Sequence, residues 1–318
     1  MAPRAAPDTI VDPLSPDHPA HVEPNAQLDG GDWVHARPGF QYSRKAAERG
    51  GVEPCDTKKL DSPAFDDWKS FDQGRYLLPA VPSLNSAGQF DLVIHLNGDE
   101  PVRRELIESG QKFVLYTLTI DPSQSYAALF TGSQLFSTIV SGLERALSAK
   151  SGKSAHVNHI AFSAWSAGFV GVEAALAQPT ADRIDAVILI DGLHAPRNDD
   201  PAFKAQLKPF IDFAERAARG DKFMFVSHSS IDPPNFASTT ECAHYLIASL
   251  GGRPQAVRRD DPMGLELVEY FSRGEFNVRG YAGNDKADHC AQLATLRQAF
   301  AALGRRWAAA PADTVPPG

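Results

Sequence analysis

The sequence predicts an α/β fold with a mainly parallel central sheet and helices on both of its faces. From about residue 90 onwards, short apolar runs alternate with segments in which apolar residues recur at the 3.6-residue period of a helix. One of these runs, AVILI at residues 186–190, is apolar at every position, which favours a strand buried on both sides. Such alternation is typical of βαβ units and therefore of a parallel sheet.

The predicted elements follow in chain order. Each expected strand is a short apolar run that ends at a turn signal or leads into a helical pattern. These strands cover residues 90–95, 112–120, 159–163, 186–190, 222–226 and about 275–281. Helices are expected from about 166 to 178 and over residues 135–147, 201–218, 238–250 and 293–303. The sequence Ser238-Thr-Thr-Glu241 is a capping box, which marks the start of one of these helices.

The two ends of the chain lack these patterns. Residues 1–24 contain six prolines and no hydrophobic periodicity, so we expect an extended, disordered arm outside any sheet. Residues 25–310 are expected to form one domain, of which 25–85 is an irregular N-terminal portion and 251–274 could form a small cap. Residues 311–318 are expected to be a disordered tail.

Composition excludes some classes of partner. The formal net charge of −8 argues against a protein that binds the nucleic-acid backbone. No apolar run reaches the ~18 residues of a membrane span. The three cysteines form no CxxC pair, so neither a zinc knuckle nor a thioredoxin-type dithiol is supported. Isolated thiols packed as small hydrophobes are favoured over a single disulfide, which stays open. The N-terminus lacks the apolar segment of a secretory signal, so we expect a cytoplasmic protein by default, or a secreted one if a leader has been removed.

Ser166 is the strongest candidate among the residues that follow strands. In sheets of this class, ligands bind beyond the carboxyl ends of the strands. The sequence Ala164-Trp165-Ser166-Ala167-Gly168 surrounds the serine with small residues, so a helix can pass close beside the preceding strand. The N–H groups at the start of that helix would face any oxyanion that develops there. The A-x-S-x-G pattern is common by chance, but its place between a strand and a helix favours a nucleophile.

Three stretches together resemble the α/β-hydrolase superfamily of serine esterases and lipases, over about residues 90–310. They are SAWSAG at 163–168, the strand-loop sequence that ends at Asp232-Pro233, and the stretch that ends at His289. The resemblance implies that Ser166 is the nucleophile, His289 the general base and Asp232 the triad acid, in the family's order along the chain. Ala164 and Ser229 stand where the family carries glycines.

Asp191 is a rival for the acid. It ends the cleanest predicted strand, and some lipase-like members of the family carry their acid after that strand. Asp232 is slightly preferred because its surroundings match the family layout residue by residue.

The resemblance also implies an oxyanion hole made of the backbone N–H groups of Ala167 and Asp99. Asp99 follows Asn97-Gly98, where the family usually has His-Gly, and its carboxylate would have to point away from the oxyanion. The residues expected to line the pocket are His95, Trp165, His194 and His228.

The expected function is hydrolysis of an ester, or of a thioester or amide, through an acyl-enzyme intermediate. The partner would be a small-molecule or acyl substrate, with no cofactor and, since no HExxH spacing occurs, no metal. Two alternatives stay open. One is a hydrolase-fold binding protein without catalysis, suggested by the departures at Ala164, Ser229 and Asn97. The other is an acyltransferase that uses the same triad. The acyl specificity and the oligomeric state are not predicted.

Overall fold

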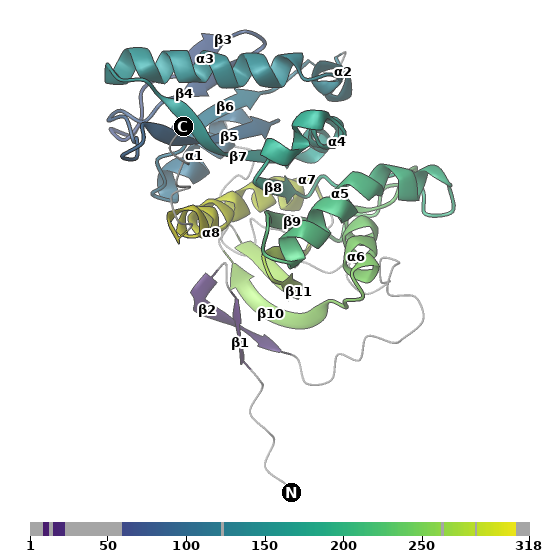
Figure 1. Cartoon of the computed structure of the whole chain (residues 1–318). Helices are drawn as coiled ribbons and strands as arrows, with labels where there is room; N and C mark the ends of the chain where they lie inside the picture. Colours follow the sequence, from purple (N-terminus) through teal and green to yellow (C-terminus); the bar gives the residue numbers. More distant parts are fainter. Residues whose placement is uncertain are drawn as a thin grey trace, which may run out of the picture.

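The strands of the described residues form one twelve-stranded sheet, with helices packed against it (Figure 1). The computed structural model describes residues 59–121, 124–261, 264–283 and 285–309, and the backbone alone of residues 9–12 and 15–22. The strand order in the sheet is β1-β2-β10-β11-β12-β9-β8-β7-β5-β6-β4-β3. Neighbours in space are therefore often distant in sequence, as crossover connections require.

The centre of the sheet consists of six parallel strands, which confirms the predicted parallel core. They are β6 (Val114–Leu118), β5 (Gln89–Leu96), β7 (His156–Trp165), β8 (Ala186–Ile190), β9 (Phe223–Ser229) and β12 (Phe276–Ala282). Every residue of β6, β8, β9 and β12 is buried, as expected for strands covered on both faces. Antiparallel β4 (Gly74–Leu77) and β3 (Lys69–Phe71) close one edge.

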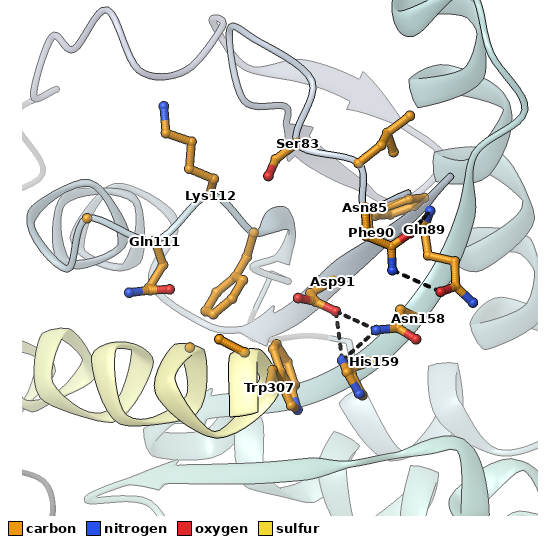
Figure 2. Close-up of a pocket in the computed structure, with 15 residues that line it drawn as sticks. Ser83, Asn85, Gln89, Phe90, Asp91, Gln111, Lys112, Asn158, His159 and Trp307 are labelled. Carbon is orange, nitrogen blue, oxygen red and sulfur yellow. Dashed lines mark hydrogen bonds and ion pairs between the residues drawn. The ribbon is translucent and has the colours of Figure 1, made fainter. Parts of the chain in front are cut away.

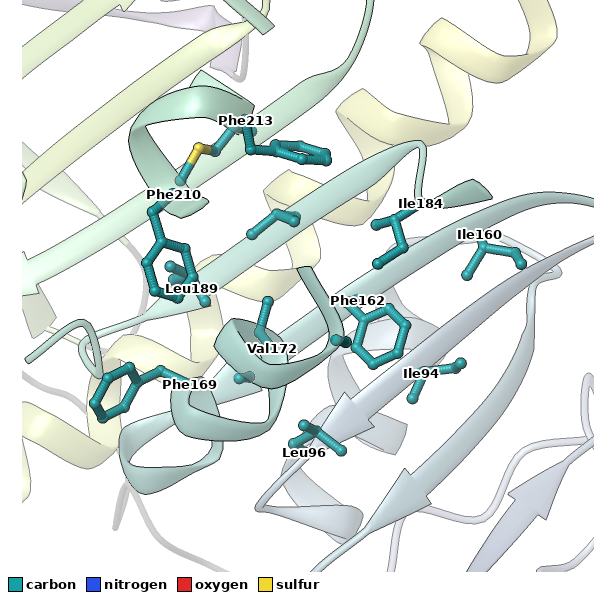
Figure 3. Packing of buried hydrophobic residues seen from close by; sticks show 14 of the residues in the cluster. Ile94, Leu96, Ile160, Phe162, Phe169, Val172, Ile184, Leu189, Phe210 and Phe213 are labelled. Atoms are coloured by element: carbon teal, nitrogen blue, oxygen red, sulfur yellow. The ribbon is translucent and has the colours of Figure 1, made fainter. Parts of the chain in front are cut away.

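Helices cover both faces of the sheet. On one face lie α2 (Tyr126–Phe130), α3 (Gln134–Ser151), α4 (Phe169–Leu176), α5 (Ala202–Ala218) and α6 (Thr239–Ser249). On the other face lie α1 (Asp99–Glu108) and α8 (Thr295–Ala309), and α7 (Lys286–Ala291) precedes α8. Figure 3 shows the first interface, where Phe162 and Leu189 of the strands pack beneath Val172 of α4 and Phe210 of α5. The chain therefore has an α/β fold with a mainly parallel central sheet and helices on both faces, as the sequence predicted.

Residues 251–274 do not form a cap. They contain β10 (Gln255–Asp261) and β11 (Leu265–Arg273), which extend the sheet as antiparallel strands beyond β12. Burial in β10 alternates along its second half, so this strand has one covered and one exposed face. Its exposed residues Arg258 and Asp260 alternate with the buried residues Val257, Arg259 and Asp261.

The N-terminal arm also joins the sheet in part. Residues Thr9–Asp12 (β1) and Ser15–Val22 (β2) pair with each other, and the end of β2 pairs with β10. Residues 9–12 and 15–22 therefore form strands, although disorder was predicted for residues 1–24. The paired positions avoid Pro16 and Pro19, so the N–H that proline lacks is not needed there. Residues 23–58 and the predicted tail 311–318 lie outside the described residues.

Two further sequence expectations can be compared with the structure. Cys242 is a buried free thiol, as expected, whereas Cys290 is disulfide-bonded, so the expectation of isolated thiols does not hold for Cys290. Among the described helices, none combines the length and the apolar character needed to cross a bilayer.

Candidate active site

Ser166 lies on a strained turn at the carboxyl end of β7. It opens a short 3₁₀ turn, Ser166–Gly168, which leads directly into α4. Its φ is 52°, in the left-handed region that residues other than glycine rarely adopt. This strand–turn–helix geometry with a strained serine is the arrangement that a nucleophile elbow would need, and the turn Ser166–Gly168 is called the elbow below.

Two glycines make room for this turn. A Cβ on Gly168 would lie 2.4 Å from the carbonyl oxygen of Leu96 in β5. A Cβ on Gly192 would lie 2.3 Å from the carbonyl oxygen of Ser166 itself. Backbone segments from three strands thus approach each other more closely than any side chain would allow. The conformation of the turn is therefore imposed by its neighbours on both sides.

His289 and Asp191 form a hydrogen-bonded pair beside this turn. Nδ1 of His289 lies 2.7 Å from Oδ2 of Asp191, although the two residues are 98 positions apart in sequence. Since a carboxylate oxygen only accepts, Nδ1 carries the proton and Nε2 of the neutral ring has a free lone pair. An imidazole held in this tautomer can take a proton from a hydroxyl.

Asp191 is fixed by two more donors. Its Oδ1 accepts hydrogen bonds from the amide of Ser229 and from the hydroxyl of Thr239, both at 2.8 Å. Burial alone would raise the pKa of this carboxyl, but the hydrogen bonds and the charge of His289 outweigh it and hold the pKa below its usual value. Asp191 therefore stays ionised while 1% exposed.

Asp232 stands apart from this pair. It follows β9, as the sequence predicted, but the loop carries it to the exposed surface. The residue that reaches the site from the end of β9 is Ser229, whose amide supports Asp191. The structure therefore joins His289 to Asp191, the aspartate that the sequence placed second.

The serine, the histidine and the aspartate share one cavity. This cavity measures about 330 Å³ and includes Ser166, Asp191 and His289 in its lining. Ile231, Pro233 and Phe236 from the loop after β9 form an apolar side, and Phe236 is 40% exposed. The remaining lining residues are His194, Ser229, Thr239, Asp285 and Lys286. A reacting group would thus have apolar surface on one side and the proton-transfer groups on the other.

The two predicted oxyanion donors lie at helix starts. Ala167 is in the first turn after Ser166, and Asp99 is the first residue of α1, so the N–H of neither has an intrahelical partner. The side-chain amide of Asn97 donates to the carbonyl of Trp165 at 3.2 Å, which ties the loop before Asp99 to the elbow. The carboxylate of Asp99 accepts from Arg75 and Thr119, each at 2.6 Å, so its charge is directed to these partners.

Two of the four expected pocket residues lie at the site. The ring of Trp165 stacks on that of His289, with centroids 4.8 Å apart, and its Nε1–H donates to the His289 carbonyl at 3.3 Å. His194 lines the cavity and donates from Nδ1 to the carbonyl of Ala237 at 3.1 Å. Burial lowers the pKa of His194, so this ring favours the neutral form.

His95 and His228 do not line this cavity. His95 is fully buried below the elbow, where Nε2 donates to the Asn97 carbonyl at 2.8 Å and Nδ1 accepts from the Ser163 hydroxyl at 2.9 Å. Burial lowers the pKa of His95 to about 4, so it supports the elbow as a neutral ring. His228 faces α6 and contacts Thr240 and Glu269 instead. Both lie one residue before the end of their strands, β5 and β9, and their side chains point into the protein; the sequence had placed His228 after its strand.

A second hollow of about 510 Å³ lies at the other end of the strands (Figure 2). There Nδ1 of His159 lies 2.8 Å from Asp91, and the ring of Trp307 stacks on His159 with centroids 5.1 Å apart. Ser83 lines the same hollow from an exposed loop, away from the His159–Asp91 pair in Figure 2. Because it has no elbow, this hollow is the weaker candidate for catalysis.

Comparisons with known proteins show similarity at the level of the fold. No family model matches the sequence, and no curated protein matches it. Among solved structures, a thermostable esterase is 15% identical with a TM-score of 0.43, and the match covers 77% of this chain and 62% of that one. Ferric enterobactin esterase from Salmonella typhimurium is 13% identical with a TM-score of 0.45, covering 83% and 62%. An uncharacterised protein from Capnocytophaga ochracea is 9% identical with a TM-score of 0.43, covering 74% and 64%. The chain thus spans less than two thirds of the length of these structures.

Proposed function

We propose that this protein is a serine hydrolase that cleaves carboxylic esters with the triad Ser166, His289 and Asp191. The observation that carries the proposal is the 2.7 Å hydrogen bond between His289 and Asp191 in the cavity that Ser166 lines from its strained turn. A serine hydroxyl is a weak nucleophile, so it needs a neighbouring base in the right tautomer. Asp191 supplies that tautomer and the charge that stabilises the imidazolium.

The reaction would proceed in two steps. Ser166 Oγ attacks the ester carbonyl while His289 Nε2 takes its proton, and the N–H groups of Ala167 and Asp99 stabilise the oxyanion. Collapse of this intermediate breaks the bond to the alcohol, which receives the proton from His289. Water, deprotonated by the same imidazole, then releases the acid and restores Ser166. Every proton passes through one ring, so no cofactor is required.

The cavity favours a small substrate. A volume of about 330 Å³ is at the lower end of the range for small-molecule pockets, roughly 300–1,000 Å³. Its apolar side, built by Ile231, Pro233 and Phe236, suits a short acyl chain or an aromatic group. We therefore expect short-chain or aryl esters to be cleaved faster than long-chain esters.

A fluorophosphonate probe tests the proposal directly. The probe should label the folded protein, and peptide mapping should find the adduct on Ser166. Ser166→Ala should abolish labelling, whereas Ser163→Ala, three residues earlier on the buried strand, should retain it. If the folded wild-type protein is not labelled, the enzyme proposal fails and a binding protein with a hydrolase fold becomes the better account.

A further inference from the structure

Three side chains that are distant in sequence meet in the interior, away from the proposed triad. His228 lies near the end of β9, His244 in α6 and Glu269 in β11, and their exposures are 1%, 3% and 2%. Their nearest nitrogen and oxygen atoms all lie within 4.8 Å of one another. Nε2 of His228 and Nε2 of His244 approach the same oxygen, Glu269 Oε1, at 2.8 and 2.6 Å.

The strand pairing around Gly280 brings these side chains together. Gly280 of β12 pairs with His228 on one side and with Glu269 on the other. A Cβ at Gly280 would lie 2.4 Å from both His228 Cε1 and Glu269 Cγ, so the glycine opens the space that the two side chains share. A shift of register between Leu267 and Glu269 brings the glutamate opposite this glycine. His244 then reaches the same point from the helix above.

The protons of His228 can be assigned from its partners. The hydroxyl of Thr240 donates to the carbonyl of Ser229 at 2.6 Å, because a carbonyl only accepts. The Thr240 hydroxyl has one hydrogen, and it donates that hydrogen to Ser229. In the 2.9 Å contact with His228 the Thr240 oxygen must therefore accept, and Nδ1–H of His228 donates. In a neutral ring Nε2 then carries the lone pair, and although it lies 2.8 Å from Glu269 Oε1 it has no partner with hydrogen-bond geometry among the described residues. A buried lone pair this close to a carboxylate oxygen needs a positive charge between them, which either a second proton on the ring or a metal ion supplies.

We propose that His228, His244 and Glu269 bind a zinc ion. Imidazole nitrogens and a carboxylate oxygen are ligands that zinc prefers, and an imidazole that binds zinc usually donates its other N–H to a neighbouring oxygen, as His228 does to Thr240. Zinc bonds of roughly 2.0–2.1 Å place tetrahedral ligand atoms about 3.4 Å apart, so the three side chains need only small shifts to enclose the ion. Water would complete the coordination.

The ion would have a structural role that does not depend on the proposed hydrolase activity. It would join β9, α6 and β11, three elements whose ligands lie between 228 and 269 in sequence. Ser229, next to the ligand His228, donates its amide to Asp191. Loss of the ion should therefore loosen the end of β9 that supports the proposed triad acid.

Metal analysis of the full-length protein, purified without a histidine tag, tests the proposal. We expect about one zinc per chain by inductively coupled plasma mass spectrometry, and visible absorption bands of tetrahedral Co²⁺ after exchange with cobalt. Removal of zinc with a chelator should lower the melting temperature, and zinc at about 100 times its dissociation constant should restore it by about 5–10 °C.

Matched variants separate the site from non-specific binding. His244→Gln should lose the zinc, and Gly280→Ala should lose it by blocking the shared space. His159→Gln should keep it, because His159 pairs with a carboxylate elsewhere, 2.8 Å from Asp91. Fewer than about 0.1 equivalents of zinc and cobalt in the wild-type protein, even after incubation with either ion, would overturn the proposal. Equal zinc binding by wild type and His244→Gln would also overturn it.

Discussion

Asp191→Asn removes the charge from a carboxyl group that is 1% exposed and accepts hydrogen bonds from Ser229, Thr239 and His289. The amide oxygen of asparagine can replace the oxygen that faces Ser229 and Thr239. Its NH₂ group then faces Nδ1 of His289, so the histidine must accept there and carry its proton on Nε2. In that tautomer His289 cannot take the proton of Ser166.

The expected loss of activity follows from this tautomer. We expect kcat to fall about 10⁴-fold, which corresponds to about 5.5 kcal/mol of transition-state stabilisation. The protein should also lose roughly 1.5–3 kcal/mol of unfolding free energy at neutral pH, because a charged acceptor of buried hydrogen bonds is lost. Hydrolysis of a chromogenic short-chain ester measures the first effect, and chemical denaturation the second.

The pH dependence of the stability difference adds an independent check. The pKa of Asp191 is lowered in the folded protein from its ordinary value of 3.8, so its contribution is present above that value. The contribution is lost as the pH falls through the folded-state pKa. The difference between wild type and Asp191→Asn should therefore shrink below about pH 4.

Asp232→Asn is the control, because Asp232 is exposed after β9 and should be dispensable. Activity of this variant within about twofold of wild type is expected. The assignment of the acid would be refuted if Asp232→Asn lost several orders of magnitude in kcat while Asp191→Asn kept most of its activity.

Three further predictions concern the surroundings of the site and the core. Gly192→Ala places a methyl group 2.3 Å from a backbone oxygen of the elbow, so we expect a loss of activity and of at least about 2 kcal/mol in stability, measured by ester hydrolysis and denaturation. Trp165→Leu removes the ring that stacks on His289 and should lower kcat about 2- to 10-fold with little change in KM. Burial raises the pKa of Glu105 from 4.5 to about 7, so its contribution to stability is present below about pH 4.5 and is lost as the pH rises through 7. Glu105→Gln should therefore gain stability relative to wild type between pH 5 and 8, by up to about 3 kcal/mol in denaturation curves.

The sequence predicted the parts of the fold that depend on local pattern. The six parallel strands and the serine on its turn are marked by short apolar runs and small residues. The aspartate that pairs with His289 was harder to predict, because Asp191 and Asp232 both follow predicted strands and the family layout favoured Asp232. What distinguishes them is the pair of donors, Ser229 and Thr239, that long-range folding brings to Asp191. Thr239 belongs to the predicted capping box, but its second role has no local signal.

Other features depend wholly on contacts between distant elements. Strand β10, QAVRRDD, is too polar to be recognised as a strand from its sequence, and it forms by pairing with β11, which in turn pairs with β12. The cluster of His228, His244 and Glu269 has no motif, since its members come from a strand, a helix and another strand. Gly280, which leaves the space for that cluster, has no local sequence signal, because its role depends on His228 and Glu269 on the two neighbouring strands.

The strained turn at Ser166 can be tested through its cost in stability. A φ of 52° costs a residue with a side chain roughly 1–2 kcal/mol, a cost that the proposed role of Ser166 as nucleophile accounts for. Ser166→Gly should therefore be about 1 kcal/mol more stable than Ser166→Ala in denaturation experiments, although both lack the nucleophile. Ala164→Gly is the matched control, because Ala164 lies in β7 without a positive φ and should lose about 0.5–1 kcal/mol. If Ser166→Ala proved the more stable of the pair, the turn would be unstrained, and the argument that function maintains it would fail.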